Sequence, residues 1–255
     1  MLCNCCWIIM RDVHVHDNDG NTVLHLAAIH GHIEVARMLL ERNVEVNCRN
    51  DDGSTPILRA LEEGKYDVAW LLLDHRADAH VRDNEGNTPL HQVARKGHLE
   101  AARKLLVCNV EVNSRNHHGS TPLFLASENG HTGVLQLLLD HNADVNLCDS
   151  GGDTPLHRAA FMGQVGVAQI LLKHNVEVNS RNANGSTTLH RAVERYSARK
   201  EIVQLLLNHD ADVEARNFGG KTASEEVQDR SWGWAFVSNQ HKEEIVQLLS
   251  QHAAK

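Results

Sequence analysis

The chain has 255 residues, with 25 Lys and Arg against 33 Asp and Glu, so its formal net charge is −8. This acidic balance argues against a surface that follows nucleic-acid phosphates, and nucleic acid is not expected as a partner. No apolar run approaches the ~20 residues that a helix needs to cross a bilayer, so no integral membrane segment is expected. The cysteines suggest no disulfide framework, which favours reduced thiols in the cytoplasm or the nucleus.

The first residues are apolar and rich in cysteine. Cys3, Cys5 and Cys6, together with His14 and His16, could in principle bind a metal. We interpret this loose group as incidental and expect no metal site, while reversible lipidation of the cysteines stays open.

One short motif recurs along the chain. Gly-x-Thr appears at a constant spacing of 33 residues, beginning at Gly20, Gly53, Gly86, Gly119, Gly152 and Gly185. A fixed period of this length is typical of a stacked repeat array, in which each unit buries apolar surface against its neighbours. We therefore predict one domain that is built from repeats.

Each motif predicts a pair of helices. The Thr hydroxyl can accept from free amides at a helix N-terminus, and a following Pro loses no donor that the helix needs, so a first helix should begin after each Thr. A His at the third helical position can reach back to the capping Thr, as Glu does in a capping box. These His are His25, His91, His157 and His190. A second helix should follow each turn, because apolar residues recur there at helical spacing, as at 134–139.

The residue after each second helix is expected in the left-handed conformation. Asn or Asp, the best formers of that conformation after Gly, holds this place in all but one of the copies. The residues are Asn43, Arg76, Asn109, Asn142, Asn175 and Asp210. Arg76 is the poorest fit, which predicts a locally less stable end to its repeat.

The words Thr-Pro-Leu-His at 88–91 and 154–157 resemble the ankyrin repeat. The resemblance implies an all-α repeat solenoid of helix-turn-helix units joined by β-hairpin loops, with six repeats over residues 17–216. Members of that family bind other proteins, so the resemblance implies a monomeric, non-catalytic scaffold that takes a partner protein on its concave face and hairpin tips. The alternative is the target-recognition fragment of a larger adaptor, such as a ubiquitin-ligase substrate receptor, or of a multidomain enzyme.

Both ends depart from the regular pattern. Residues 1–16 are expected to form a partial N-terminal repeat or cap, and a missing preceding region is the other interpretation. Residues 217–255 are expected to form a degenerate capping repeat with an aromatic insertion. Trp232 and Trp234 in this insertion either cover the last repeat or stay exposed as contacts for a partner, and both interpretations remain open.

The chain lacks the marks of an enzyme. Catalysis needs unlike groups that converge, whereas this sequence offers the same groups every 33 residues, and no phosphate loop, zinc-protease helix or nucleophile elbow is present. We expect no catalysis and no cofactor. Most of the 19 histidines stand at three repeat positions, where a structural role accounts for them.

Variation between copies should mark the binding side. The pairs before the first three motif glycines carry acids, as Asp51 and Asp52 do, whereas His117 and His118 hold the fourth tip. Acidic tips favour a basic segment of a partner. The two histidines are either a solvated tip or a pH-sensitive contact.

The ends of the first helices vary as well. They form a charge mosaic that includes Glu62 and Arg95, with one apolar patch of Phe161 and Met162 beside Leu125. The patch is either a binding hot spot or packing against the adjacent first helix. The predicted partner-binding residues are Asp51, Asp52, Glu62, Arg95, His117, His118, Leu125, Phe161, Met162, Trp232 and Trp234.

The family resemblance also suggests a modification. Ankyrin repeats are substrates of an asparaginyl hydroxylase, and the segments that end in Asn47, Asn113, Asn146 and Asn179 match its preferred pattern of Leu, five residues, an acid, an aliphatic residue and Asn. The competing interpretation gives these Asn a structural role, in which they stabilise the turn through local hydrogen bonds.

Overall fold

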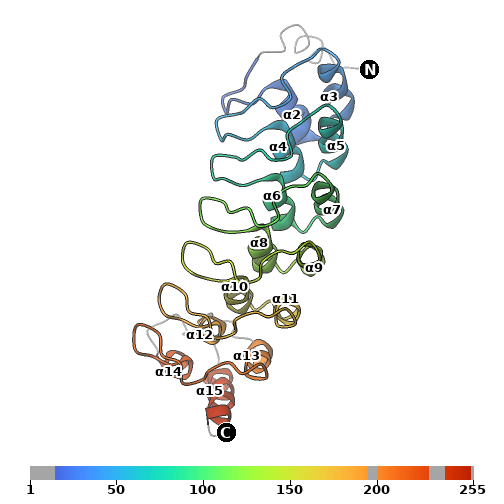
Figure 1. Ribbon diagram of the computed structural model, residues 1–255. Helices are drawn as coiled ribbons and strands as arrows, with labels where there is room; N and C mark the ends of the chain where they lie inside the picture. The colour runs from blue at the N-terminus through green and yellow to red at the C-terminus, as the bar shows by residue number, and fades with distance from the viewer. Residues whose placement is uncertain (1–14, 195–199, 230–238, 254–255) are drawn as a thin grey trace. The chain divides into compact units, whose positions relative to one another are not determined.

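The computed structural model describes residues 15–194, 200–229 and 239–253. The chain divides into two compact units, Met1–His117 and His118–Lys255. Within each unit, paired antiparallel helices repeat and long loops connect one pair to the next (Figure 1). The prediction of an all-helical repeat array is confirmed. The residues that the structure does not describe include several of those singled out in the sequence, namely Cys3, Cys5, Cys6, His14, Trp232 and Trp234.

Three helix pairs make up the described part of the N-terminal unit. The first helices are α2 (Val23–His30), α4 (Pro56–Glu62) and α6 (Pro89–Lys96), and the second helices are α3 (Ile33–Leu40), α5 (Tyr66–Asp74) and α7 (Leu99–Val107). Helix α4 packs on both α2 and α6, and α3 packs on α5. The first helices thus form one layer and the second helices another, with the loops extending from the side of the first layer (Figure 1).

The C-terminal unit follows the same plan. Its first helices are α8 (Pro122–Asn129), α10 (Pro155–Met162), α12 (Thr188–Val193) and α14 (Ala223–Gln228). Its second helices are α9 (Thr132–Asp140), α11 (Val165–Leu171), α13 (Lys200–Leu207) and α15 (Asn239–Ala253). Each first helix packs on the next first helix, and each second helix on the next second helix.

Leucines fill the space between the layers. Leu90, Leu123, Leu138 and Leu156 are fully buried, and alanines such as Ala126 let neighbouring helices approach closely. Since each such side chain is removed from water by its own and adjacent pairs, the apolar core is distributed along each unit.

Helix starts follow the predicted capping. In α2, α6 and α10 the N-cap Thr accepts a hydrogen bond from the backbone N–H of the third helical residue, and the His there closes a capping box. A capping box is also present at the start of α12. Thr55, before α4, has Leu58 in place of the His, and its buried hydroxyl finds no hydrogen-bond partner among the described residues. The first helix of the second repeat therefore has Thr at its N-cap position without the side-chain hydrogen bond that a cap normally provides.

The predicted left-handed residues are confirmed. Asn43, Asn109, Asn142, Asn175 and Asp210 all have positive φ, and so does Arg76 at +67°. An arginine carries the steric cost of this conformation without the local polar contacts that help Asn and Asp.

The loops between helix pairs form turns without a β-ladder in the described residues. Most of them are closed by a backbone hydrogen bond across the motif, as from Asn50 N–H to the Ser54 carbonyl at 3.0 Å. The sole β-bridge in the described residues joins His16 and Thr22, so no sheet forms there. The hairpin ladder that the family resemblance implied is reduced to these turns.

Candidate partner-binding surface

The tips of successive loops are joined by their main chains. In the N-terminal unit, Asp51 N–H donates to the Asp19 carbonyl at 3.1 Å, and Asn84 N–H donates to the Asp52 carbonyl at 3.0 Å. The C-terminal unit repeats the bond from Ser150 N–H to the His118 carbonyl at 2.8 Å. These bonds hold neighbouring tips at a fixed separation, so their side chains form an ordered row.

The acidic tips lie on this row. Asp19, Asp51, Asp52 and Glu85 are all exposed. Within the described part of the chain, Asp51 and Asp52 form no ion pair and their carboxylates accept no hydrogen bond. The two side chains that carry the prediction of an acidic surface are therefore available to a partner.

Arginines brace the bases of the tips. The Arg49 guanidinium donates to the Gly53 carbonyl at 3.0 Å and to the Arg82 carbonyl at 2.7 Å. Arg82 makes the equivalent pair of bonds one repeat later. The sequence interpretation missed this brace, although Arg at 49, 82, 115 and 181, spaced in multiples of 33, carries its signal. These cations are engaged with the main chain and leave the tip acids unneutralised.

The capping histidines also connect repeats. In His25, Nδ1 accepts from Thr22 N–H at 3.2 Å and Nε2 lies 2.9 Å from the Ser54 carbonyl of the next repeat. Since a carbonyl can only accept, this arrangement assigns the neutral Nε2–H tautomer. Burial lowers the pKa of His25, as it does for His157 and His190. These residues are structural, and they do not belong to a binding surface.

The ends of the first helices are less open than the tips. Glu62 is half-buried and pairs with Arg59 at 2.6 Å, and Arg95 is also half-buried. Leu125 is 6% exposed, so it packs in the core and offers a partner almost no area. Most of the side chains in the predicted charge mosaic are therefore partly buried or already contact other residues of the N-terminal or C-terminal unit.

Phe161 lies between two arginines. Its ring centroid is 5.3 Å from the Arg158 guanidinium carbon and 4.3 Å from that of Arg191, which belongs to the adjacent first helix α12. Phe161 and Met162 are both half-buried. The two arginine side chains therefore cover much of the Phe161 ring, as the packing interpretation predicts. A partner can contact the part of the ring that remains exposed.

The comparisons with known proteins decide the family. A family model described as ankyrin repeats (3 copies) matches residues 2–83, 75–149 and 143–217. This chain belongs to the ankyrin repeat family. No curated protein sequence matches it.

Solved ankyrin structures share the fold. The crystal structure of the human ASB11 ankyrin repeat domain has 23% sequence identity and a TM-score of 0.78, and the match covers 91% of this chain and 98% of that one. The crystal structure of the ankyrin repeat domain of Bcl-3, described as a unique member of the IkappaB protein family, has 26% identity and a TM-score of 0.71, covering 91% and 100%. Ankyrin domains in general are protein-interaction modules and are typically non-catalytic.

Three of the four candidate hydroxylation sites form a hydrogen bond to the next repeat. Asn47 Oδ1 accepts from Asp78 N–H at 2.9 Å, and Asn179 Oδ1 accepts from Asp212 N–H at 2.8 Å. We expected these Asn side chains to form local hydrogen bonds within their turn. Their Oδ1 atoms instead accept from residues 31 or 33 positions further along the chain. Asn146 makes the same type of bond to Glu177 N–H at 3.2 Å. Hydroxylation at these Asn and at Asn113 stays a prediction.

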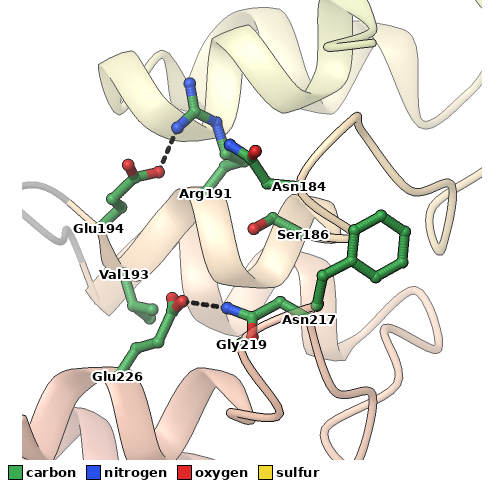
Figure 2. Close-up of a pocket in the computed structure, with 9 residues that line it drawn as sticks. Asn184, Ser186, Arg191, Val193, Glu194, Asn217, Gly219 and Glu226 are labelled. Atoms are coloured by element: carbon green, nitrogen blue, oxygen red, sulfur yellow. Dashed lines mark hydrogen bonds and ion pairs between the residues drawn. The ribbon is translucent and has the colours of Figure 1, made fainter. Parts of the chain in front are cut away.

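Few other chemical features occur among the described residues. No described helix has the length and apolarity to span a membrane. No group of three or more His, Cys, Asp or Glu that could hold a metal occurs in the described ranges. A pocket of about 390 Å³ in the C-terminal unit is the exception, with Glu226, Glu194 and Asn217 among its lining residues (Figure 2).

Proposed function

We propose that this ankyrin domain is a non-catalytic interaction module whose N-terminal tips bind a basic segment of a partner protein. The observation that carries the proposal is the row of exposed carboxylates at Asp51, Asp52 and Glu85 on loops joined by main-chain hydrogen bonds. Because the adjacent arginines engage main-chain carbonyls, the row keeps its negative charge. Its complement is a segment rich in Arg or Lys.

The exposed charges favour recognition by electrostatic steering of the partner toward the tips. Exposed charges at a binding rim chiefly raise the rate of association and make it sensitive to salt. The fixed spacing of the tips removes part of the ordering cost that a mobile loop would have on binding. The module is therefore expected to capture its partner faster at low ionic strength.

The test reverses the charge of the tip. A double variant, Asp51→Lys with Asp52→Lys, is titrated with a synthetic peptide of alternating Arg and Gly, beside the unaltered chain, at 50 and 300 mM salt. We expect affinity at least about tenfold weaker at low salt and a flatter salt dependence, since attraction becomes repulsion. The partner selected from cell extract should be lost in parallel.

The matched control places the same charge change elsewhere in the unit. Glu41 and Glu45 are exposed and lie at and beyond the end of α3. Changing both to Lys alters net charge equally, so an effect of net charge alone would weaken both double variants alike. Unchanged peptide binding by the Asp51/Asp52 variant would reject the proposed surface.

A further inference from the structure

The C-terminal unit contains a pocket between its last two described loops. Helix α12 and the loop before it contribute Ser186, Arg191 and Glu194, and the next loop with α14 contributes Asn217 and Glu226 (Figure 2). The exposed aromatic ring of Phe218, which is 78% exposed, also lines it. The volume of about 390 Å³ falls within the usual range for ligand pockets.

Glu226 has an unused oxygen in this pocket. Its Oε1 accepts a hydrogen bond from the Asn217 side-chain amide (Figure 2). Among the described residues, Oε2 has no hydrogen-bond partner. A partly buried carboxylate with an unsatisfied oxygen favours the approach of a donor.

Counted over the described residues alone, the charges around Glu226 leave the pocket acidic. From α12, Glu194 pairs with Arg191, and Arg191 is also held by Asp153 at 2.8 Å. Arg191 is therefore already paired with two carboxylates, those of Glu194 and Asp153, even without Glu226. Lys221, from the preceding loop, pairs with Asp229.

Helix α14 itself and the helix that packs on it also carry charges. On its own helix α14, Glu225 binds Arg216 at 2.8 Å. On α15, which packs against α14, the charged residues with described side chains near its start are Glu243 and Glu244, and Glu244 pairs with Lys200 at 3.5 Å. Among the side chains that the structure describes, neither helix provides an unpaired cation to neutralise the pocket.

We propose that this pocket binds the arginine side chain of a partner protein, with the guanidinium on the carboxylate of Glu226, near Glu194, and against the ring of Phe218. A guanidinium is planar and forms forked hydrogen bonds with carboxylates, and it stacks on aromatic faces, whereas a lysine ammonium does neither as well. The inference rests on the proposed function in that the ligand belongs to a protein, but it uses different residues from the acidic tips.

Protonation of Glu226 supplies a readout. Burial, reinforced by Glu194 and opposed by Lys221 and Arg191, raises the pKa of Glu226 to about 7. Arginine does not titrate in this range, so binding should require the ionised glutamate and release a proton. From the ionised fractions at a pKa of 7, we expect about tenfold tighter binding at pH 8 than at pH 6.

The experiment titrates the full chain with acetyl-Gly-Arg-Gly-amide and follows the protein by NMR at both pH values. We expect perturbations at residues 184–194 and 217–226, and a lower Glu226 pKa, from its side-chain carboxyl shift, when the peptide saturates. Glu226→Gln should weaken binding and abolish the pH dependence. Glu201→Gln, the same charge change at an exposed position on α13, should do neither.

Three outcomes would overturn the inference. The first is equal binding of the same peptide with citrulline in place of arginine, because citrulline has similar shape and no charge. The second is an unshifted Glu226 pKa in the saturated unaltered chain, a result that does not depend on the folding of any variant. The third is a peptide whose binding is lost only in the Asp51→Lys and Asp52→Lys variant, which would leave the proposed function standing.

Discussion

The Nε2–H of His25 donates to the carbonyl oxygen of Ser54, 29 residues further along the chain, at 2.9 Å. His157 makes the same bond to Ser186 at 3.2 Å, and His190 bonds Lys221 at 3.0 Å. One imidazole thus caps its own helix through Nδ1 and joins the following repeat through Nε2. Adding a proton at Nδ1 removes the acceptor on which the cap depends.

These histidines should make stability fall in mild acid. Their pKa values are lowered in the folded chain from the ordinary 6.5, mainly by burial, so the folded state binds fewer protons than the unfolded state. Their contribution is complete above pH 6.5 and is lost as pH falls below it, at no more than about 1.4 kcal/mol per pH unit for each histidine. Urea unfolding at pH 7.5, 6.5 and 5.5 measures the slope.

The variant His157→Gln isolates one of these contributions. Gln can accept from Thr154 N–H as in a capping box but does not titrate, so the stability difference from the unaltered chain should shrink as pH falls. His174→Gln, at an exposed position, is the control. Parallel pH profiles for His157→Gln and the unaltered chain would contradict the assignment.

Thr55 and Thr154 should respond oppositely to the same substitution. Thr154 accepts from His157 N–H, whereas the buried Thr55 hydroxyl has no hydrogen-bond partner in the part of the chain that the structure describes. Thr154→Val should cost about 0.5–2 kcal/mol, the usual loss of an N-cap. Thr55→Val should be neutral or stabilising, because it removes an unsatisfied buried polar group. Chemical denaturation of both variants decides, and equal losses would refute the distinction.

Arg76→Gly should stabilise the second repeat. Arg76 has φ of +67°, and relief of the left-handed strain is worth about 1 kcal/mol. Asn142→Gly, at φ of +62°, should gain less because Asn already tolerates this conformation. Hydrogen exchange in α5 should slow in the first variant, and no gain over the Asn142 variant would argue against strain at Arg76.

Leu138→Ala should destabilise the C-terminal unit. Leu138 is fully buried in α9, and such truncations cost about 2–5 kcal/mol. Val107→Ala, at a side chain that is 82% exposed, should change the free energy of unfolding by less than about 0.5 kcal/mol. Comparable losses from both would mean that Leu138 is not part of a packed core.

Local features could be predicted from the sequence. A Thr cap involves only four consecutive residues, so the helix starts after Thr88 and Thr154 follow from short motifs alone. A left-handed Asn involves a single residue, so the helix end near Asn109 can be predicted in the same way. The paired-helix array follows in turn from the 33-residue period.

Contacts between repeats could not be predicted in the same way. The hydrogen bond between Asn47 and Asp78 and the one between His25 and Ser54 depend on how one repeat packs on the next. The hydrogen bond from Asn217 to Glu226 likewise depends on how the loop meets α14. Asn217 stands three residues before Gly220, as Asn50 does before Gly53, but this periodic place does not by itself indicate a contact with Glu226. For Phe161, stacking of Arg191 from α12 determines how much of the ring remains for a partner.

The bonds that join Asp51 and Asp52 to neighbouring tips use the main-chain atoms of these two residues and not their side chains. Within one loop, the residues that fix the turn are therefore different from the side chains that a partner can contact. Gly53, at φ of +69° and with an added Cβ only 2.1 Å from Asn84 Oδ1, cannot change without disturbing the turn. Asp51 and Asp52 contribute their peptide groups to the row, whatever side chains they carry. Specificity at these two positions can therefore evolve, or be engineered, independently of the ability to fold.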